Sequence, residues 1–560
     1  MWPIRDAESG FWVNEASDRG TLGVGALGGW TMGRDDEARA VAVAPHAAAA
    51  QAAARVLKEG GCAIEAMVAA AAVIAVVYPH MTGLGGDGFW LIHEPGREPY
   101  GIDAGGPVGT LATPDFYRAW GHETMPARGP LAANTVAGTV AGWELALASV
   151  RRPALPLGRL LEDAIEHAER GFMVTESQAA STSGRLAELC GRPGFREHFL
   201  APDGTALAHR AMLRQPALAA TLRGLARRGL RDFYEGGVAA LIAADLAAVA
   251  SPVTGGDLRT YRARLVAPLR MAHSLGTLYN LPPPTQGVLS LMILGILDRL
   301  GLDHRPREGA DMIHLALEAT KRAFLWRDRH KGLFLEAGAD VGEWLKSAWL
   351  DAETSAIDLS RAAPWHAVEG PADTVWLGVV DHRGCAVSFI QSLYHEFGSG
   401  VVLPGTGICW QNRGTSLSLA GAADRIAPGR RPFHTLNPAL AVLADGRVLA
   451  YGAMGGDGQP QTQAAVFTRV AVYGDDPRQA VAAPRWLLGR TWGSACDDVK
   501  IETRFPDAVF DELEGRGHVV SRLDPFDEVV GHAGLVMRDA TGALSGGADP
   551  RSDGAVVFVE

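Results

Sequence analysis

The run "DTVWLGVVD" at residues 373–381 constrains the fold more than any other stretch, because it is apolar on both faces of a strand. Alternation along a strand separates two sets of side chains: Thr374, Trp376, Gly378 and Val380 on one face, and Val375, Leu377 and Val379 on the other. A strand with two apolar faces has to be covered on both. We therefore expect this run to be buried.

Two hairpins are predicted after residue 374. The turn "HRG" and the apolar run "CAVSFIQSLY" follow the first strand directly, which is typical of a hairpin. "PALAVLADGRVLAYGAMGG" predicts a second hairpin that turns at Asp445 and Gly446, because Asp-Gly favours tight turns between antiparallel strands. Strands should therefore dominate this part of the chain.

The chain before residue 374 has a mainly helical pattern. Apolar residues recur at helical spacing at 46–58 and 62–78, and again in much of 153–350. The charged, proline-containing stretch 350–373 is typical of an exposed connector. The change from helical to strand pattern thus falls close to Thr374.

Composition and charge exclude several classes of protein. The chain has 560 residues, 47% apolar and 21% charged, which is enough for one large or two medium cores. Its formal net charge of -11 argues against a general nucleic-acid or membrane-surface binder, since either needs a basic excess. The stretch 1–20 lacks an apolar signal-peptide core, and the longest apolar run, 66–78, is shorter than the ~20 residues that span a bilayer. We therefore expect a cytoplasmic protein.

Common cofactor and nucleophile motifs are missing or misplaced. The 5 cysteines form no CxxC pair, so reduced structural thiols are expected. Gly83, Gly85 and Gly88 match the GxGxxG dinucleotide fingerprint, but this loop follows a helix and opens a strand, the reverse of the order required. A tight turn is the better interpretation. The sequence contains no HExxH, Walker loop or GxSxG, so metal hydrolysis, phosphate transfer and serine-hydrolase chemistry have no support.

The dipeptide Asp373-Thr374 lies where the expected connector meets the expected buried strand. Cleavage there would give Thr374 a free α-amine, which titrates at about 7.7 to 8.0 and could act as the base for its own hydroxyl. Attack of the same hydroxyl on the Asp373 carbonyl would first give an ester that water hydrolyses. An Asp-Thr pair also commonly starts a strand or turn through side-chain to backbone hydrogen bonds. The dipeptide alone leaves both interpretations open.

Longer blocks favour the first interpretation by resemblance. "DTVWLGVVDHRGCAVSFIQSLYHEFGSGVVLPGTGICWQNRG" resembles the start of the small subunit in the γ-glutamyltranspeptidase family of N-terminal-nucleophile hydrolases. Further blocks resemble that family over most of the chain: "HAAAAQAAARVLKEGGCAIEAMVAAAAVIAVVYPHMTGLGGDGF", "TVAGTVAGWE", "LLEDAIEHAERGF", "YNLPPPTQG" and "AYGAMGGDGQPQTQ". The resemblance implies an α+β, four-layer αββα sandwich with two antiparallel sheets between helix layers. A large subunit, 1–373, and a small subunit, 374–560, would build it jointly.

The resemblance also implies catalytic roles. Thr374 would be both nucleophile and base, with cleavage between Asp373 and Thr374. The backbone N–H groups of Gly455 and Gly456 would form the oxyanion hole, although a simple loop is the other interpretation of this pair. Ser392 takes the place of a family threonine that hydrogen-bonds the nucleophile during processing.

Positions that bind the substrate carboxylate differ from the family. Members that bind γ-glutamyl groups read D-x-R-E-x-A-P, whereas this chain reads "IDAGGPVG", with Gly105 and Gly106 in place of the arginine and glutamate. The arginine that anchors the carboxylate is therefore missing from this segment. His434 and Thr435 replace the serine pair that binds the same carboxylate.

Other positions near the nucleophile change as well. Positions that would recognise the substrate α-amino group become Tyr394, Arg413 and Ser416, so an acidic residue is lost and a cation gained. The threonine and histidine that follow the nucleophile in the family become Val375 and Trp376. These changes should alter the pocket without removing the reaction, because hydroxyl and amine both belong to the nucleophile.

The substrate is inferred from the replaced positions. Four side chains could bind a small carboxylate close to the scissile amide: those of Arg413, His434, Thr435 and Tyr394. "SFIQSLYHEFGSG" with "RPFHTLNPA" resembles the oxamate amidohydrolase branch of the family, which implies hydrolysis of oxamate to oxalate and ammonia. At His434 the alternative is a histidine that is hydrogen-bonded to the backbone. At Arg413 the alternative is an ion pair between the two subunits. A γ-glutamyl hydrolase or transpeptidase, a cephalosporin or glutaryl acylase, and an unprocessed non-catalytic scaffold stay open for the whole chain.

Neither a cofactor nor a metal is expected, because Thr374 supplies both hydroxyl and amine. The expected partners are a small amide substrate and the second chain that cleavage creates, giving a heterodimer of the two processed chains. A dimer of these heterodimers is left open, and no nucleic-acid or membrane partner is expected.

Overall fold

The apolar run after residue 372 forms β10 (Asp373–Val380), an inner strand of an antiparallel sheet. The computed structural model describes residues 34–35, 37–151, 153–336, 339–365, 373–489 and 497–560. We call the first sheet the β10 sheet, and its strands follow in the order β21 (Ala555–Val559), β2 (Ala40–Ala44), β10, β11 (Ala386–Tyr394), β3 (Asp87–His93), β4 (Tyr100–Ala104) and β7 (Arg264–Val266). Strands from before and after Thr374 are therefore interleaved within one sheet.

A second antiparallel sheet, the β15 sheet, packs against the first. Its order is β1 (Arg34–Asp35), β20 (Leu544–Ala548), β19 (Ala533–Arg538), β15 (Val448–Ala453), β14 (Ala439–Leu443), β9 (Gly276–Asn280) and β8 (Leu269–His273). Shorter strands form three small sheets: β5 (Phe172–Met173) with β6 (Met212–Leu213), β12 (Val402–Leu403) with β13 (Ile408–Cys409), and β16 (Trp486–Leu488), β17 (Val499–Glu502) and β18 (Val520–Leu523).

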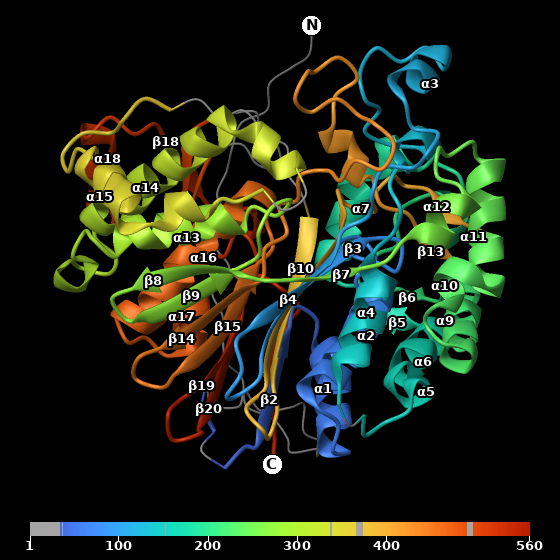
Figure 1. The fold of residues 1–560 in the computed structure, drawn as a ribbon, viewed down its shortest axis with the longest axis horizontal. Helices are drawn as coiled ribbons and strands as arrows, with labels where there is room; N and C mark the ends of the chain where they lie inside the picture. Colours follow the sequence, from blue (N-terminus) through green and yellow to red (C-terminus); the bar gives the residue numbers. More distant parts are fainter. Residues whose placement is uncertain (1–33, 36, 152, 337–338, 366–372, 490–496) are drawn as a thin grey trace, which may run out of the picture. The chain divides into compact units, whose positions relative to one another are not determined.

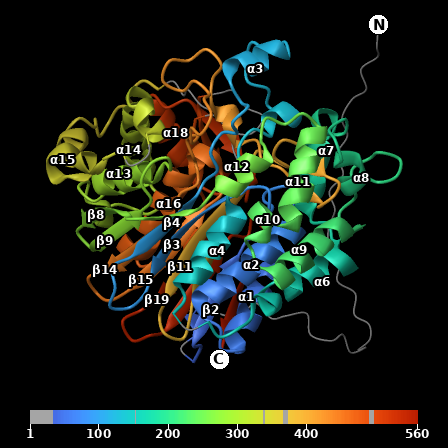
Figure 2. The same cartoon turned by 45° about the vertical axis from the view of Figure 1, so that its right-hand side comes forward.

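Helices cover the outer face of each sheet (Figure 1). The layer on the β10 sheet contains α1 (Ala47–Lys58), α2 (Ala63–Val77), α4 (Thr139–Ser149), α5 (Leu157–Leu160), α6 (Glu162–Arg170), α7 (Glu176–Leu189), α8 (Phe195–Phe199), α9 (Pro216–Arg228), α10 (Asp232–Glu235), α11 (Gly237–Ala248) and α12 (Gly255–Thr260). The layer on the β15 sheet contains α13 (Gly287–Leu297), α14 (Ala310–Arg329), α15 (Ser347–Ser355), α16 (Gln459–Phe467), α17 (Pro477–Ala482) and α18 (Asp507–Gly515). Figure 2 shows the first layer from its outer side, and the short helix α3 (Pro114–Ala119) lies apart from it. The expected four-layer αββα arrangement is confirmed.

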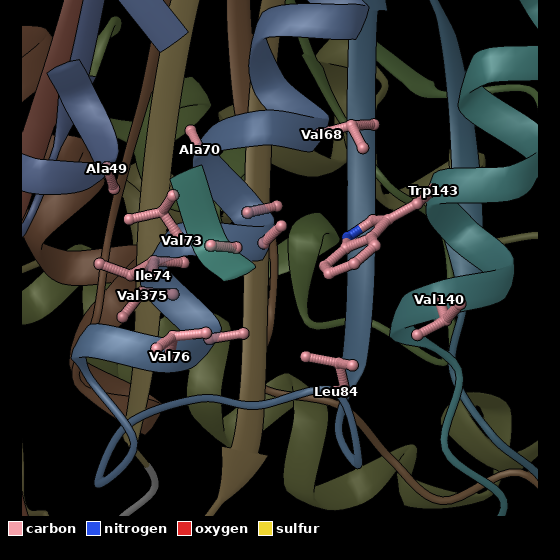
Figure 3. Packing of buried hydrophobic residues seen from close by; sticks show 14 of the residues in the cluster. Ala49, Val68, Ala70, Val73, Ile74, Val76, Leu84, Val140, Trp143 and Val375 are labelled. Carbon is pink, nitrogen blue, oxygen red and sulfur yellow. The ribbon is translucent and has the colours of Figure 1, made fainter. Parts of the chain in front are cut away.

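The two faces of β10 pack as the sequence predicts. Val375, Leu377 and Val379 belong to the apolar cluster under α1 and α2, and Figure 3 shows Val375 beside Ile74 of α2. Trp376 and Val380 instead enter the layer between the two sheets. Burial on both faces follows from the four layers.

Trp376 is accommodated by glycines of the facing sheet. An added Cβ at Gly452 or Gly534 would lie 2.1 or 2.3 Å from the Trp376 ring. The indole Nε1 donates to Ser388 Oγ at 2.9 Å, which satisfies its buried N–H. The position that carries a histidine in the resembled family is thus a packing residue here.

Local sequence patterns correspond well to these elements. β10 and β11 form the first predicted hairpin, and β14 and β15 form the second, with Gly446 at φ 89° in its turn. The helices α1 and α2 match the expected spans 46–58 and 62–78. The loop with the GxGxxG match does open a strand, β3, as a turn should.

Most of 153–350 is helical, as predicted, with one longer exception. Residues 264–280 form β7, β8 and β9 rather than helix, and they supply one edge of each large sheet. In the described part of the chain, no helix is long and apolar enough to cross a membrane. Four of the five cysteines are free thiols in the described residues, and Cys496 lies outside them.

Buried side chains of α14 hold the described end of the connector. The Nε2 of His314 lies 2.8 Å from the carbonyl of Asp358, and Lys321 Nζ donates to the carbonyl of Ala363 at 2.8 Å. Glu318 accepts from the Ala363 N–H at 3.2 Å and from Lys321 at 2.7 Å. Residues 358–361 are exposed, as expected, whereas the remainder of the connector, 366–372, lies outside the described residues.

The same cluster has the composition of a metal site. His314, Glu318 and His518 place one ligand atom each within 4.8 Å of one another. However, the Nδ1 of His314 is 2.8 Å from the Nε2 of His518, and the Lys321 ammonium already pairs with the Glu318 carboxylate. These contacts already use the ligand atoms, so we interpret the cluster as a hydrogen-bonded anchor for the connector.

Candidate active site

Thr374 is the second residue of β10, at an irregular point in its pairing with β11. The register shifts between Asp373 and Val375, and the Thr374 side chain is buried, with 1% exposure. Its Oγ1 accepts a hydrogen bond of 3.3 Å from Nε2 of Gln459, the first residue of α16. The hydroxyl is therefore held between the two sheets.

Gly455 and Gly456 follow β15 and lead into α16, so they belong to the loop that reaches Thr374 through Gln459. Their φ angles are 119° and 53°, a region in which only glycine is unstrained. Within the described part of the chain, neither backbone N–H donates to another protein group. The pair has the conformation and the available donors that an oxyanion hole requires.

Gln286, which precedes α13, ties this loop to the segment that contains Thr435. Its Nε2 donates to the carbonyl of Gly456 and to the carbonyl of Thr435, both at 2.8 Å. The Arg327 guanidinium donates to the carboxylate of Asp457, the next residue of the loop, at 2.9 Å. Two side chains from before residue 374 thus position a loop from after it.

Ser392 lies near the end of β11 and is paired with Asp87 of β3. Its Oγ accepts the N–H of Tyr394 at 2.8 Å, and its side chain is buried. Tyr394 itself has a φ of 83°, which is rare for a residue with a side chain and marks local strain. Ser392 therefore stabilises the strained turn that presents the Tyr394 ring.

Arg413 is almost fully buried against this turn. Its Cζ lies 3.9 Å from the centre of the Tyr394 ring, a cation–π contact, and its Nε donates to the carbonyl of Phe433 at 2.7 Å. The cation is thereby fixed beside His434, the residue after Phe433. Ser416, the third altered position of this group, is half-buried and donates to the carbonyl of Arg413 at 3.0 Å.

His434 and Thr435 contribute buried polar atoms to the same region. The Nε2 of His434 lies 3.2 Å from Oδ2 of Asp87. Burial, reinforced by the Arg413 charge, lowers the pKa of His434 to about 4, so the imidazole is neutral near pH 7. Within the described residues, His434 Nδ1 and Thr435 Oγ1 have no hydrogen-bond partner. Both atoms are therefore available to a polar ligand.

Arg431 was missed by the sequence analysis. Its guanidinium forms a bidentate ion pair with Asp103 and donates to the carbonyl of Gly105 at 2.5 Å. A Cβ at Gly105 would lie 3.2 Å from Arg431 Nη2 and 3.1 Å from His434 Nε2. A cation thus lies beside Gly105 although it comes from a different segment, and only its position three residues before His434 could have indicated it.

The sequence comparisons identify the family. The Gamma-glutamyltranspeptidase family pattern matches residues 49–559. The chain belongs to the γ-glutamyltranspeptidase family. Oxamate amidohydrolase proenzyme of Klebsiella pneumoniae is 54% identical over 519 residues, covering 92% of this chain and 97% of that protein. A glutathione hydrolase-like proenzyme of Bacillus subtilis is 37% identical over 520 residues, covering 92% and 98%.

A solved structure has the same fold. The crystal structure of cephalosporin acylase from Bacillus halodurans superposes with a TM-score of 0.84 at 30% identity, covering 96% of this chain and 98% of that one. Membership of the γ-glutamyltranspeptidase family and the α+β N-terminal-nucleophile fold are therefore both established for this chain.

Proposed function

We propose that this chain is a self-cleaving N-terminal-nucleophile amidohydrolase that converts oxamate and water to oxalate and ammonia. The observation that carries the reaction is the buried Thr374 hydroxyl, held beside the Gly455-Gly456 loop by Gln459. The 54% identity to an oxamate amidohydrolase proenzyme supports the substrate. The expected heterodimer of chains 1–373 and 374–560 is part of this proposal.

Self-cleavage begins with Thr374 Oγ1 attacking the carbonyl carbon of Asp373. The peptide C–N bond breaks as the new C–O bond forms, and the Thr374 nitrogen takes up the proton that the hydroxyl loses. Water then hydrolyses the ester, which leaves a carboxylate on Asp373 and a free α-amine on Thr374. This amine titrates at about 7.7 to 8.0 and is a suitable base near neutral pH.

Turnover uses the same hydroxyl. The α-amine of Thr374 removes the hydroxyl proton as Oγ1 attacks the amide carbon of oxamate, and the oxyanion is stabilised by the N–H groups of Gly455 and Gly456. The amine returns the proton to the leaving nitrogen, which departs as ammonia. Water, activated by the amine, then hydrolyses the oxalyl ester and restores the hydroxyl.

The side chains proposed to bind the carboxylate favour a short substrate whose carboxylate is next to the scissile amide. Arg413 is fixed as a buried cation, and the neutral His434 and the Thr435 hydroxyl offer hydrogen-bonding atoms beside it. Gly105 supplies no side chain where γ-glutamyl-binding relatives carry an arginine. A substrate whose carboxylate lies far from its amide, such as a γ-glutamyl compound, would lack the contact to that arginine.

The deciding experiment compares kcat/KM of the processed wild type for oxamate and for γ-glutamyl-p-nitroanilide. Ammonia release from oxamate, with oxalate formed in equal amount, is the expected result. A preference for the γ-glutamyl compound would overturn the substrate and favour a γ-glutamyl hydrolase. Activity on a glutaryl or cephalosporin amide with none on oxamate would favour an acylase instead, the activity named for the structural relative.

A further inference from the structure

Gln459 is buried against the proposed nucleophile and belongs to a network of amide side chains. It has 0% exposure, and Asn437, Asn280, Gln463 and Ser290 around it are equally buried, at 0 to 1%. Buried amides have to be hydrogen-bonded at both ends, and each bond fixes which end is oxygen and which is nitrogen. The orientation of the Gln459 amide can therefore be assigned step by step, starting from a backbone group whose role as donor is known.

The orientation starts at the backbone N–H of Leu281. This N–H donates to Oδ1 of Asn280 at 2.8 Å, so the Asn280 amide nitrogen is the end that faces the network. That nitrogen donates to Oδ1 of Asn437 at 3.3 Å, and Ser290 Oγ donates to the same oxygen at 3.0 Å. Asn437 consequently presents its nitrogen on its other side.

Asn437 passes this orientation on to Gln459. The Nδ2 of Asn437 donates to the carbonyl of Thr435 at 2.8 Å and to Oε1 of Gln459 at 3.1 Å. With its oxygen bound in this way, Gln459 directs its Nε2 at Oγ1 of Thr374, 3.3 Å away. The backbone carbonyl of Asn437 also accepts from Gln463 at 2.6 Å, which locks the central residue.

A hydroxyl that accepts this hydrogen bond has one proton left to donate. The proton must point away from Gln459, and in the processed enzyme the acceptor on the same residue is the α-amine. The amide N–H also lies beside the atom that bears negative charge whenever its bond to the substrate carbon forms or breaks. Both effects act on the rate of the chemical step rather than on substrate binding.

We propose that Gln459 is a catalytic residue, the hydrogen-bond donor to Thr374 Oγ1, and that Asn437 and Asn280 are positioning residues that fix its orientation. The inference rests on the proposed role of Thr374 as nucleophile. It does not depend on oxamate being the substrate, because self-cleavage uses the same hydroxyl.

The test compares Gln459→Glu and Gln459→Met with a buried glutamine elsewhere. Glutamate has the shape of glutamine, and its carboxylate can still accept from Asn437, but when ionised it accepts from Thr374 instead of donating. We expect kcat to fall about 10- to 100-fold in both variants, with KM within about two-fold of the wild type. For Gln459→Glu the deficit should shrink as the pH is lowered, since a protonated carboxyl can donate again.

Gln215→Leu is the matched control, because Gln215 is 2% exposed and donates to the carbonyl of Val76 at 2.9 Å, within the other helix layer. It should lower the melting temperature without changing kcat. If the Gln459 variants lose stability to the same extent but keep the wild-type kcat and cleavage rate, Gln459 is structural and the inference is overturned.

Self-cleavage keeps this result separate from the substrate question. The rate of cleavage at Asp373-Thr374, followed in freshly synthesised chain, should also fall in both Gln459 variants. If cleavage is slow in the variants and the wild type is inactive on oxamate, the proposal of oxamate as substrate is wrong, but the role of Gln459 as hydrogen-bond donor stands. Normal cleavage and normal turnover in Gln459→Met, whose side chain cannot donate at any pH, would overturn the donor role alone.

Discussion

Arg431 and Asp103 form a buried bidentate ion pair directly beside Gly105. Arg431 belongs to the segment after residue 374, and Asp103 lies near the end of β4. The Arg431 side chain occupies the space into which a side chain at position 105 would extend. The neighbouring Gly106 is more restricted still, since its backbone approaches the carbonyl of Val136. Gly105 and Gly106 are therefore both built into the packing.

These contacts predict different outcomes for two small substitutions. A Cβ at Gly106 would lie 1.6 Å from the Val136 carbonyl oxygen, a backbone clash that cannot be relieved by a side-chain rotation. A Cβ at Gly105 would meet only side-chain atoms, at 3.1 to 3.2 Å. We expect Gly106→Ala to lower the unfolding free energy by several kcal/mol and Gly105→Ala by about 1 kcal/mol. Denaturant unfolding of both variants checks this, and equal losses would contradict it.

Self-cleavage should require the Thr374 hydroxyl. Thr374→Ala is expected to give one uncut chain without activity, because both cleavage and turnover use that oxygen. Thr374→Ser should retain part of both functions, since only the methyl group that restricts χ1 is lost. Intact-mass analysis and N-terminal sequencing decide the matter. Cleavage or turnover in Thr374→Ala would show that another residue is the nucleophile.

Arg413 should govern substrate affinity. Charge-assisted contacts to a carboxylate are worth about 1.5 to 3 kcal/mol, so Arg413→Ala is expected to raise KM for oxamate roughly ten- to a hundred-fold. His434→Ala should act in the same direction but less strongly, because its imidazole is neutral near pH 7. Cleavage at Asp373-Thr374 should survive in both, as the protein's own peptide is its substrate. An unchanged KM in Arg413→Ala would show that Arg413 does not bind the substrate carboxylate.

Acid should destabilise the protein through its buried histidines. Burial lowers the pKa of His80 and His395 to about 3, and that of His46 and His434 to about 4, from 6.5. The unfolded chain takes up protons at these rings below about pH 6.5 whereas the folded chain does not. The stability is therefore complete above 6.5 and falls as the pH drops, toward 4 for His46 and His434 and toward 3 for His80 and His395. For His80 alone the loss at pH 5 is about 2 kcal/mol.

The variant that tests this linkage is His80→Phe. The His80 ring packs between Tyr78 and Phe397, with ring centres 4.3 and 6.2 Å away. A phenyl ring can keep this packing and loses the 3.3 Å contact between His80 Nε2 and Ser177 Oγ. The melting temperature of the variant should fall less than that of the wild type between pH 7.5 and 4.5. Parallel curves for the two proteins would show that His80 does not carry the acid sensitivity.

The part of the fold that sequence could predict is the part encoded locally. The Asp445-Gly446 turn and the alternation on either side fix a hairpin within a short segment, and α2 is specified by an unbroken apolar run. The strands β8 and β9 are different, because β9 pairs with β14, whose residues come more than a hundred positions later. No local pattern indicates such a partner. β8 and β9 also pair with each other, and the sequence analysis did not separate this local hairpin from the helical pattern around it.

The candidate site divides in the same way. Thr374, Gly455 and His434 could be named because motifs around them resemble a family. Arg431 could not, since its partner Asp103 is 328 positions away and the segment between them gives no sign of the contact. Gln459 stands in a quoted block, but its importance lies in a chain of amide orientations that only the packed structure contains.

The strand order of the β10 sheet has a consequence for the lifetime of the molecule. β10 and β11 lie between β2 and β3, and β21 lies outside β2, so pieces on the two sides of Thr374 are interleaved. In the uncut chain each of these pairings closes within one molecule, at the high effective concentration that a covalent link provides. Once the link is cut, the same pairings would have to form between two separate chains at their bulk concentration. A protein cut after folding would thus stay assembled on dilution, but after denaturation its recovery would depend on protein concentration, whereas that of the uncut Thr374→Ala chain would not.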